Sequence, residues 1–257
     1  MLLKSHEVSQ ILIRIGIKKG DNIFLHVDAF VCAYLHGINF DDKINTLIAG
    51  FTDLIGDEGT LVLPTFTYSA TKNEVFDPVK TKSEVGVITD YFRIKDKVFR
   101  SNNPIFSVSA TGKLSNEFKD SSITDCFGEG TCFDLIYKNN FWILTLGCSF
   151  DRITFIHFVE QHNNVSYRYF KNFKSEIYSD SKLNSSQIRY FVRDLNRDSD
   201  VSLDKLKESL ISKELLKIDS INRASILAVR SEDFFNTANE MIDTKENIHT
   251  NEGNYEI

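Results

Sequence analysis

Two short apolar segments joined by an amphipathic helix constrain the fold of this chain more than any other feature of its sequence. Residues 23–27 and 61–63 are apolar throughout, except for His26. Between them, residues 42–55 repeat apolar side chains at helical spacing and end at Gly56. Strands without polar alternation are typical of a sheet that helices cover on both faces. The segment therefore predicts an α/β fold.

The rest of the chain alternates between similar elements and loops, which predicts a single domain over residues 1–245. Residues 66–82 have no clean period and are long for a connection, which is typical of a binding loop. Residues 177–205 are rich in Ser, Asn and Asp and predict a polar surface insertion or lobe, and residues 246–257 predict a flexible tail. Further strands are expected at 106–110, 141–146 and 226–229, and further helices at 5–15, 84–93, 114–119, 131–137, 154–161 and 231–241.

The charge and the cysteines argue against several classes of protein. The formal net charge is −6, whereas nucleic-acid-binding domains are usually basic. No apolar run approaches the roughly 20 residues that cross a bilayer, and the first ten residues do not form a secretion signal. The four cysteines form no CxxC pair and match no zinc spacing. We therefore expect a cytoplasmic protein with reduced thiols, no membrane insertion and no nucleic-acid partner.

Residues 154–160 contain the densest candidate for catalysis. His157 and Glu160 are three positions apart, so on a helix they share one face while neighbouring apolar residues anchor the core. A neutral imidazole can take a proton from a reacting amine, and a carboxylate beside it fixes its tautomer. A partly buried structural pair is the alternative that this spacing leaves open.

Two other places suggest ligand contacts. Residues 128–131 combine backbone amides with a helix start, which suits an anion such as a coenzyme A phosphate, although a plain capped turn has the same pattern. His26 closes the first strand, and strand ends in α/β sheets are favoured ligand positions, although a backbone carbonyl would equally satisfy this side chain. A metal site built from His26, His157, Glu160 and His162 matches no known spacing, so no metal is expected.

A series of motifs in a fixed order is more specific than any of these sites. It begins with Gly20-Asp21 and Phe24-Leu25-His26, continues with GDEGTLVLPTFT at residues 56–67 and includes the Thr-x-x-His-x-x-Glu pattern of residues 154–160. Further members are Phe76-Asp77-Pro78, Arg100-Ser101, Pro104-Ile105-Phe106-Ser107-Val108, Gly112, Phe127-Gly128, Leu146-Gly147, Tyr167-Arg168 and Arg223-Ala224. Together these motifs resemble the aminoglycoside 3-N-acetyltransferase family over residues 10–245.

The resemblance implies an enzyme that uses acetyl-CoA or another acyl-CoA, needs no metal and acylates an amine. It implies a three-layer α/β/α fold with a mixed central sheet, distinct from that of the GNAT acetyltransferases. His157 corresponds to the catalytic base, and Glu160 either orients it or holds the amine. By position, the coenzyme should contact Asp28, Ala29, Phe30, Ser107 and Thr131, the substrate should contact Thr67 and Asp77, and hydroxyls near Thr65, Thr67 or Ser107 should stabilise the oxyanion.

Departures from the family pattern bear on the substrate. The family usually has two serines where this chain has Val27 and Asp28, and often has a histidine where it has Asn103. An aspartate repels phosphates, so this loop either sits differently or contacts the pantetheine arm of the coenzyme. These changes, together with 21 phenylalanines, are similar to the branch of the family associated with surface-polysaccharide synthesis.

We therefore predict an N-acyltransferase that acts on an amino sugar, with a nucleotide-linked amino sugar as the main expectation. An aminoglycoside acceptor, which would make the protein a resistance enzyme, is the first alternative. A non-catalytic protein that binds coenzyme A or a sugar nucleotide, and a metal-dependent hydrolase, are alternatives of other classes. The oligomeric state stays open, with a homodimer as one possibility.

Overall fold

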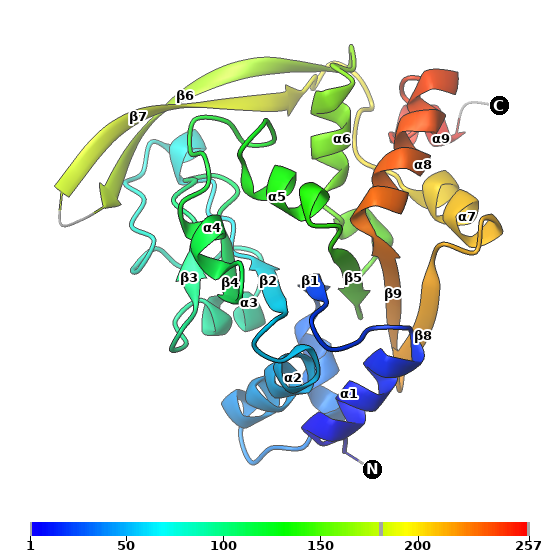
Figure 1. The fold of residues 1–257 in the computed structure, drawn as a ribbon. Helices are drawn as coiled ribbons and strands as arrows, with labels where there is room; N and C mark the ends of the chain where they lie inside the picture. Colours follow the sequence, from blue (N-terminus) through cyan, green and yellow to red (C-terminus); the bar gives the residue numbers. More distant parts are fainter. Residues whose placement is uncertain (1, 180–181, 256–257) are drawn as a thin grey trace.

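A seven-stranded mixed sheet forms the centre of the protein, as seen in a computed structural model that describes residues 2–179 and 182–255 (Figure 1). Its order is β3-β4-β2-β1-β5-β9-β8, and β1 pairs in parallel with both β2 and β5. The pairs β2–β4, β3–β4, β5–β9 and β8–β9 are antiparallel. The strands are β1 (Asn22–Val27), β2 (Thr60–Pro64), β3 (Phe99–Arg100), β4 (Val108–Gly112), β5 (Trp142–Leu146), β8 (Lys217–Ile221) and β9 (Ala224–Arg230).

Helices cover both faces of this sheet, because the apolar strands point side chains alternately into two separate cores. Phe24 of β1 belongs to one core, whereas Ile23 and Leu25 belong to the other. The core around Ile23 contains α1 (Ser5–Arg14), α2 (Phe40–Ile55) and α3 (Val87–Phe92). The core around Phe24 contains α4 (Ser115–Lys119), α5 (Cys132–Lys138), α6 (Ile156–His162), α7 (Asp204–Ser212) and α8 (Ser231–Thr244). The fold is thus the expected α/β/α arrangement with a mixed central sheet.

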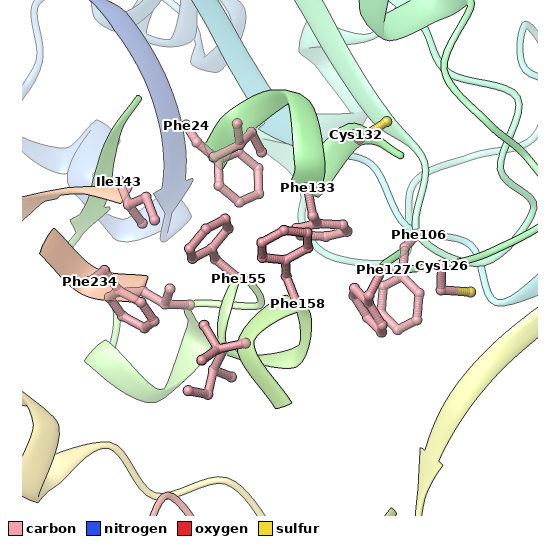
Figure 2. Close-up of a cluster of buried hydrophobic side chains, with 14 of the residues drawn as sticks. Phe24, Phe106, Cys126, Phe127, Cys132, Phe133, Ile143, Phe155, Phe158 and Phe234 are labelled. Carbon is pink, nitrogen blue, oxygen red and sulfur yellow. The ribbon is translucent and has the colours of Figure 1, made fainter. Parts of the chain in front are cut away.

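Phenylalanines dominate the core beneath α6. The rings of Phe155 and Phe158 lie stacked with their centroids 5.4 Å apart, and Phe234 of α8 meets Phe155 edge to face at 5.7 Å (Figure 2). On the sheet side, Phe24 lies 6.1 Å from Phe133 of α5. Aromatic pairs of this kind add about 0.5–1.5 kcal/mol each beyond the area they bury. The start of α6 is therefore anchored firmly against the sheet.

A long antiparallel hairpin, β6 (Arg168–Ser179) with β7 (Lys182–Arg193), lies outside the central sheet (Figure 1). The expected insertion at residues 177–205 is largely the returning half of this hairpin. Both edges are pinned to the body, since the N–H of Phe76 donates to the carbonyl of Glu176 at 2.8 Å and that of Arg189 donates to the carbonyl of Thr124 at 2.8 Å. Residues 180–181 lie outside the described residues.

The segment after Lys245 packs against the body instead of forming the loose tail that its polarity suggested. His249 and Thr250 are buried, and the N–H of Ser202 donates to the carbonyl of His249 at 3.0 Å. A short helix, α9 (Asn251–Tyr255), follows. Side-chain hydrogen bonds add to these backbone contacts, such as that of Asn254 Nδ2 to the carbonyl of Ser202 at 2.8 Å, and apolar periodicity reveals neither kind. The structure thus places residues 246–255 against the body, and residues 256–257 lie outside the described part.

Three short 3₁₀ segments connect the strands to the helices that follow them: η1 (Ala29–Tyr34), η2 (Ser69–Lys72) and η3 (Phe150–Arg152). None of the helices in the described ranges is both long and apolar enough to cross a membrane.

Candidate active site

The two candidate catalytic side chains belong to α6, which follows strand β5 after a tight turn. Gly147 follows the strand with φ +73°, a left-handed conformation that favours glycine, and η3 and α6 come next. His157 Nδ1 lies 2.6 Å from Glu160 Oε2. The Glu160 side chain is fully buried, whereas that of His157 is 17% exposed. The spacing on α6 thus brings the two predicted residues into contact, with the imidazole toward solvent.

Glu160 is a buried carboxylate with three partners. Besides His157, it is contacted by Arg168 Nε, which forms an ion pair 2.8 Å from Oε2, and by the hydroxyl of Tyr167, which donates to Oε1 at 3.1 Å. Burial alone would raise the pKa of Glu160, but the charge of Arg168 and the contacts with His157 outweigh it and lower the pKa to about 2. The carboxylate is therefore ionised at neutral pH.

His157 stays neutral at the same pH. Burial and the charge of Arg168 lower the pKa of its imidazole, and the opposing effect of Glu160 is smaller. Because the ionised carboxylate can only accept, Nδ1 carries the hydrogen and donates to it, and the lone pair is left on Nε2. A neutral imidazole with an oriented tautomer is the form that a general base requires.

Two pockets meet beside this pair. The His157 pocket has a volume of about 660 Å³ and the His26 pocket about 580 Å³. They share Tyr68 and Arg152. The His157 pocket is lined by Tyr68, Ser149, Asp151, Arg152, His157, Arg168, Tyr190, Arg193, Ser199, Asp200 and Val201. The His26 pocket is lined by His26, Val27, Asp28, Pro64, Phe66, Tyr68, Glu84, Val85, Gly86, Thr89, Cys148, Arg152 and Thr154. The arrangement suits two ligands that meet near a base.

The two shared residues both carry hydrogen-bond donors. Tyr68 has φ +55°, a strained conformation for a non-glycine residue and one that is common at functional sites. Burial raises the pKa of its phenol, so the hydroxyl remains protonated. The guanidinium of Arg152 has no hydrogen bond or ion pair among the described residues. Both groups are therefore available to an anion at the junction.

The predicted loop after β1 lies partly in the His26 pocket. Asp28 lines it, and its carboxylate accepts the N–H of Phe30 at 2.9 Å, which caps η1. Ala29 and Phe30 are not among the lining residues, and the Phe30 ring packs so closely on Gly147 that an added Cβ would lie 2.8 Å from it. His26 is buried, with its pKa lowered by desolvation to about 4, and its Nε2 accepts the N–H of Thr154 at 3.4 Å. It therefore holds the segment that leads into α6.

The predicted hydroxyls are placed differently from expectation. Thr65, Thr67, Ser107 and Thr131 are all buried and line neither pocket. Ser107 donates to the carbonyl of Thr65 at 2.7 Å, Thr67 to that of Pro104 at 3.0 Å, and Thr131 to that of Gly128 at 2.7 Å. Because each hydroxyl is committed to the backbone, the structure does not support their assignment to coenzyme, substrate or oxyanion.

Asp77 also lies apart from the base. Its carboxylate accepts the N–H groups of Val79 and Lys80 at 2.8 and 3.0 Å, and it lines a different pocket, next to Arg100 and Tyr178. The structure therefore does not bring Asp77 together with His157, and it gives no support for a substrate contact at this residue.

Several residues of the two pockets could not be identified from the sequence pattern. Tyr190 and Arg193 come from the polar hairpin, and Arg152 comes from the turn before α6. Arg168 belongs to a motif of the resemblance, but its contact with Glu160 depends on where the hairpin begins. Tyr68 directly follows the GDEGTLVLPTFT motif and could have been noticed there.

The cysteines supply no nucleophile. Burial raises the pKa of Cys148, whose thiol lies 3.5 Å from the carbonyl of His26, to about 11, and it raises the pKa values of Cys32, Cys126 and Cys132 as well. A thiolate is the reactive form, so these thiols are inert at neutral pH. Within the described part of the chain, no cluster of three or more His, Cys, Asp or Glu is arranged to hold a metal ion.

The structure explains the asparagine at position 103, where the family often has a histidine. Its side-chain oxygen accepts the N–H groups of Ile105 and Phe106 at 3.0 and 2.9 Å, and its amide donates to the carbonyl of Asp125 at 3.0 Å. Asn103 therefore fixes the loop before β4, in a place where an imidazole would offer fewer hydrogen bonds.

Known proteins resemble both the sequence and the fold. The aminoglycoside N(3')-acetyltransferase-like protein YokD of the SPbeta prophage in Bacillus subtilis (strain 168) is 24% identical over 176 residues, which cover 60% of this chain and 63% of YokD, so this chain spans less than two thirds of that relative. The structure of AAC-IIIb with CoASH has a TM-score of 0.81 at 18% identity, covering 95% of this chain and 98% of that one.

The structure of AAC-VIa bound to sisomicin has a TM-score of 0.82 at 15% identity, and the likeness covers 95% of this chain and 99% of that one. These structural likenesses show a shared fold, and the sequence itself is matched by a family model. That model, described as aminoglycoside 3-N-acetyltransferase, matches residues 30–243. The chain therefore belongs to the aminoglycoside 3-N-acetyltransferase family.

Proposed function

We propose that this protein is an acyl-CoA-dependent N-acetyltransferase that acetylates the amine of a sugar in the cytoplasm. One observation carries the proposal: a neutral histidine, oriented by a buried carboxylate, lines a pocket that adjoins a second one. Family membership supports it, as does the solved relative that holds CoASH.

The His26 pocket is the proposed site of the donor. Its lining carries the carboxylates of Asp28 and Glu84 and the single guanidinium of Arg152. This balance disfavours the phosphates of the coenzyme and suits its uncharged pantetheine arm. The thioester would then lie at the junction with the His157 pocket, beside Tyr68.

The chemistry follows from the tautomer of His157. Nε2 takes a proton from the acceptor amine as the nitrogen attacks the thioester carbonyl, so a C–N bond forms. The tetrahedral oxyanion is stabilised by the Tyr68 hydroxyl and the Arg152 guanidinium, which replace the buried hydroxyls that the sequence suggested. The C–S bond then breaks, and the thiolate takes the proton from the imidazolium. Because the four thiols are inert, transfer is direct and needs no acyl-cysteine.

Two acceptor classes have support. The family and the sisomicin-bound relative favour an aminoglycoside. The His157 pocket also offers a contact to an anion, the guanidinium of Arg152, which has no ion pair among the described residues. The other two guanidinium groups of the lining are paired, Arg168 with Glu160 and Arg193 with Asp200. An amino sugar linked to a nucleotide, with its negative phosphates, is therefore the second candidate.

Release of free thiol from acetyl-CoA tests the proposal. The acceptor panel contains several aminoglycosides together with UDP- and dTDP-linked amino sugars, and His157→Ala serves as the blank. Turnover only on aminoglycosides would support the first class, and turnover only on nucleotide sugars the second. An inactive panel combined with measurable coenzyme A binding would favour a binding protein and count against catalysis.

A further inference from the structure

We propose that Arg168 is a positioning residue for the base: it holds Glu160 in place and keeps His157 in its uncharged form. The inference rests on the proposed role of His157 and extends it to a residue on a different element. Arg168 is the first residue of the β6–β7 hairpin, whereas His157 and Glu160 belong to α6.

The argument begins with one shared oxygen atom. His157 Nδ1 and Arg168 Nε lie 2.6 and 2.8 Å from the same oxygen, Glu160 Oε2. The side chains of Arg168 and Glu160 are only 3% and 0% exposed, so water does not screen this ion pair. Arginine is always protonated in proteins. Since Arg168 already neutralises the carboxylate, a second positive charge on His157 would have no anion of its own.

Glu160 is also fixed from its other side. The hydroxyl of Tyr167, which directly precedes Arg168, donates to Oε1 at 3.1 Å. Arg168 Nη1 donates to the carbonyl of Phe191 on β7 at 3.4 Å, which ties the guanidinium to both hairpin strands. The start of the hairpin therefore determines the orientation of the carboxylate, and the carboxylate determines that of the imidazole.

The other charged groups around His157 either have hydrogen-bond or ion-pair partners of their own or are more exposed to solvent than Arg168. Asp151 accepts the N–H of Leu203 at 2.7 Å and the hydroxyl of Ser149 at 2.7 Å, and Asp200 pairs with Arg193. The titratable and charged groups that face the pocket from the surrounding elements are Tyr68, Asp151, Arg152, Tyr190, Arg193 and Asp200. Among the described residues, only Glu160 forms an ion pair with His157, so Arg168 acts through the nearest charge.

The test follows the imidazole directly by NMR titration. The signal of His157 is identified among the six histidines by its loss in His157→Ala. In Arg168→Met the titration midpoint should rise by about one pH unit or more, because a nearby cation is removed. Arg168→Lys keeps the cation, and its midpoint should stay close to that of the unaltered protein. Arg230→Met, which breaks the remote ion pair with Asp21, is the control and should leave the midpoint unchanged.

Activity separates this proposal from the one on which it rests. In Arg168→Met, the acid side of the pH profile of kcat/KM should shift to higher pH together with the His157 midpoint. If the midpoint moves and the pH profile does not, His157 is not the base, while the effect of Arg168 on the ring stands. An unmoved midpoint in Arg168→Met overturns the proposal. If that variant does not fold, Arg168→Gln, which removes the charge but keeps a polar side chain, decides in the same way: a raised His157 midpoint supports the proposal, and an unmoved one overturns it.

Discussion

Replacing His157 by alanine should separate catalysis from stability. Loss of a general base lowers kcat by roughly 10²–10⁴-fold, which corresponds to about 2.7–5.4 kcal/mol at 1.36 kcal/mol per tenfold change. The cost in unfolding free energy should be smaller, about 1–3 kcal/mol, because one charge-assisted hydrogen bond is lost. Glu160 keeps Arg168 and Tyr167 as partners, so no buried charge is left alone.

The assay is thiol release from acetyl-CoA at saturating acceptor, combined with urea unfolding of the same preparations. His162→Ala is the matched control, because His162 ends the same helix but is exposed and packs its ring edge to face on Phe235, away from Glu160. It should retain activity. A loss of less than threefold in His157→Ala, with unchanged folding, would remove His157 from the role of base.

Three further predictions concern pH, the oxyanion and the support of α6. Folding lowers the pKa values of both His157 and Glu160, so the unfolded chain binds more protons than the folded one. The unfolding free energy should therefore fall as the pH drops below 6.5, where His157 of the unfolded chain takes up a proton, and fall further from 4.5 toward 2, where Glu160 does. Urea titrations at several pH values would show this. Tyr68→Phe should lower kcat about 10²-fold with an unchanged Tm, since its hydroxyl forms no hydrogen bond with the described residues. Full activity would exclude the oxyanion role. Asp125→Ala should lower the free energy of unfolding in urea by about 2–4 kcal/mol, because Asp125 accepts hydrogen bonds from Phe127, Gly128 and Gln161. It also forms an ion pair with the half-exposed Arg189, which adds less. A decrease under 0.5 kcal/mol would contradict this account.

The centre of the fold could be predicted from sequence because its elements are strongly periodic. The apolar run at Ile23–Leu25 and the helical spacing from Ile44 to Ile55 each fit one element type, and they appear as β1 and α2. The contact between His157 and Glu160 was predictable for the same reason, since three residues on a helix fix the geometry.

The hairpin and most of the pocket could not be predicted in this way. Strand β7 buries little more than Ile188 and Phe191, so its sequence resembles a polar loop. Ser107 lies in a motif of the family, yet a single bond rotation decides whether its hydroxyl faces a ligand or the carbonyl of Thr65. Tertiary packing makes such choices, and local sequence does not encode them.

The order of strands in the sheet has a consequence for synthesis. Strand β5 pairs on one side with β1, which precedes it, and on the other with β9, which is made about 80 residues later. While the ribosome is still adding those residues, the outer edge of β5, with its apolar side chains, has no neighbour within the chain. Unpaired edges of this kind recruit other strands, so the nascent protein passes through an interval in which a chaperone has a defined edge to protect.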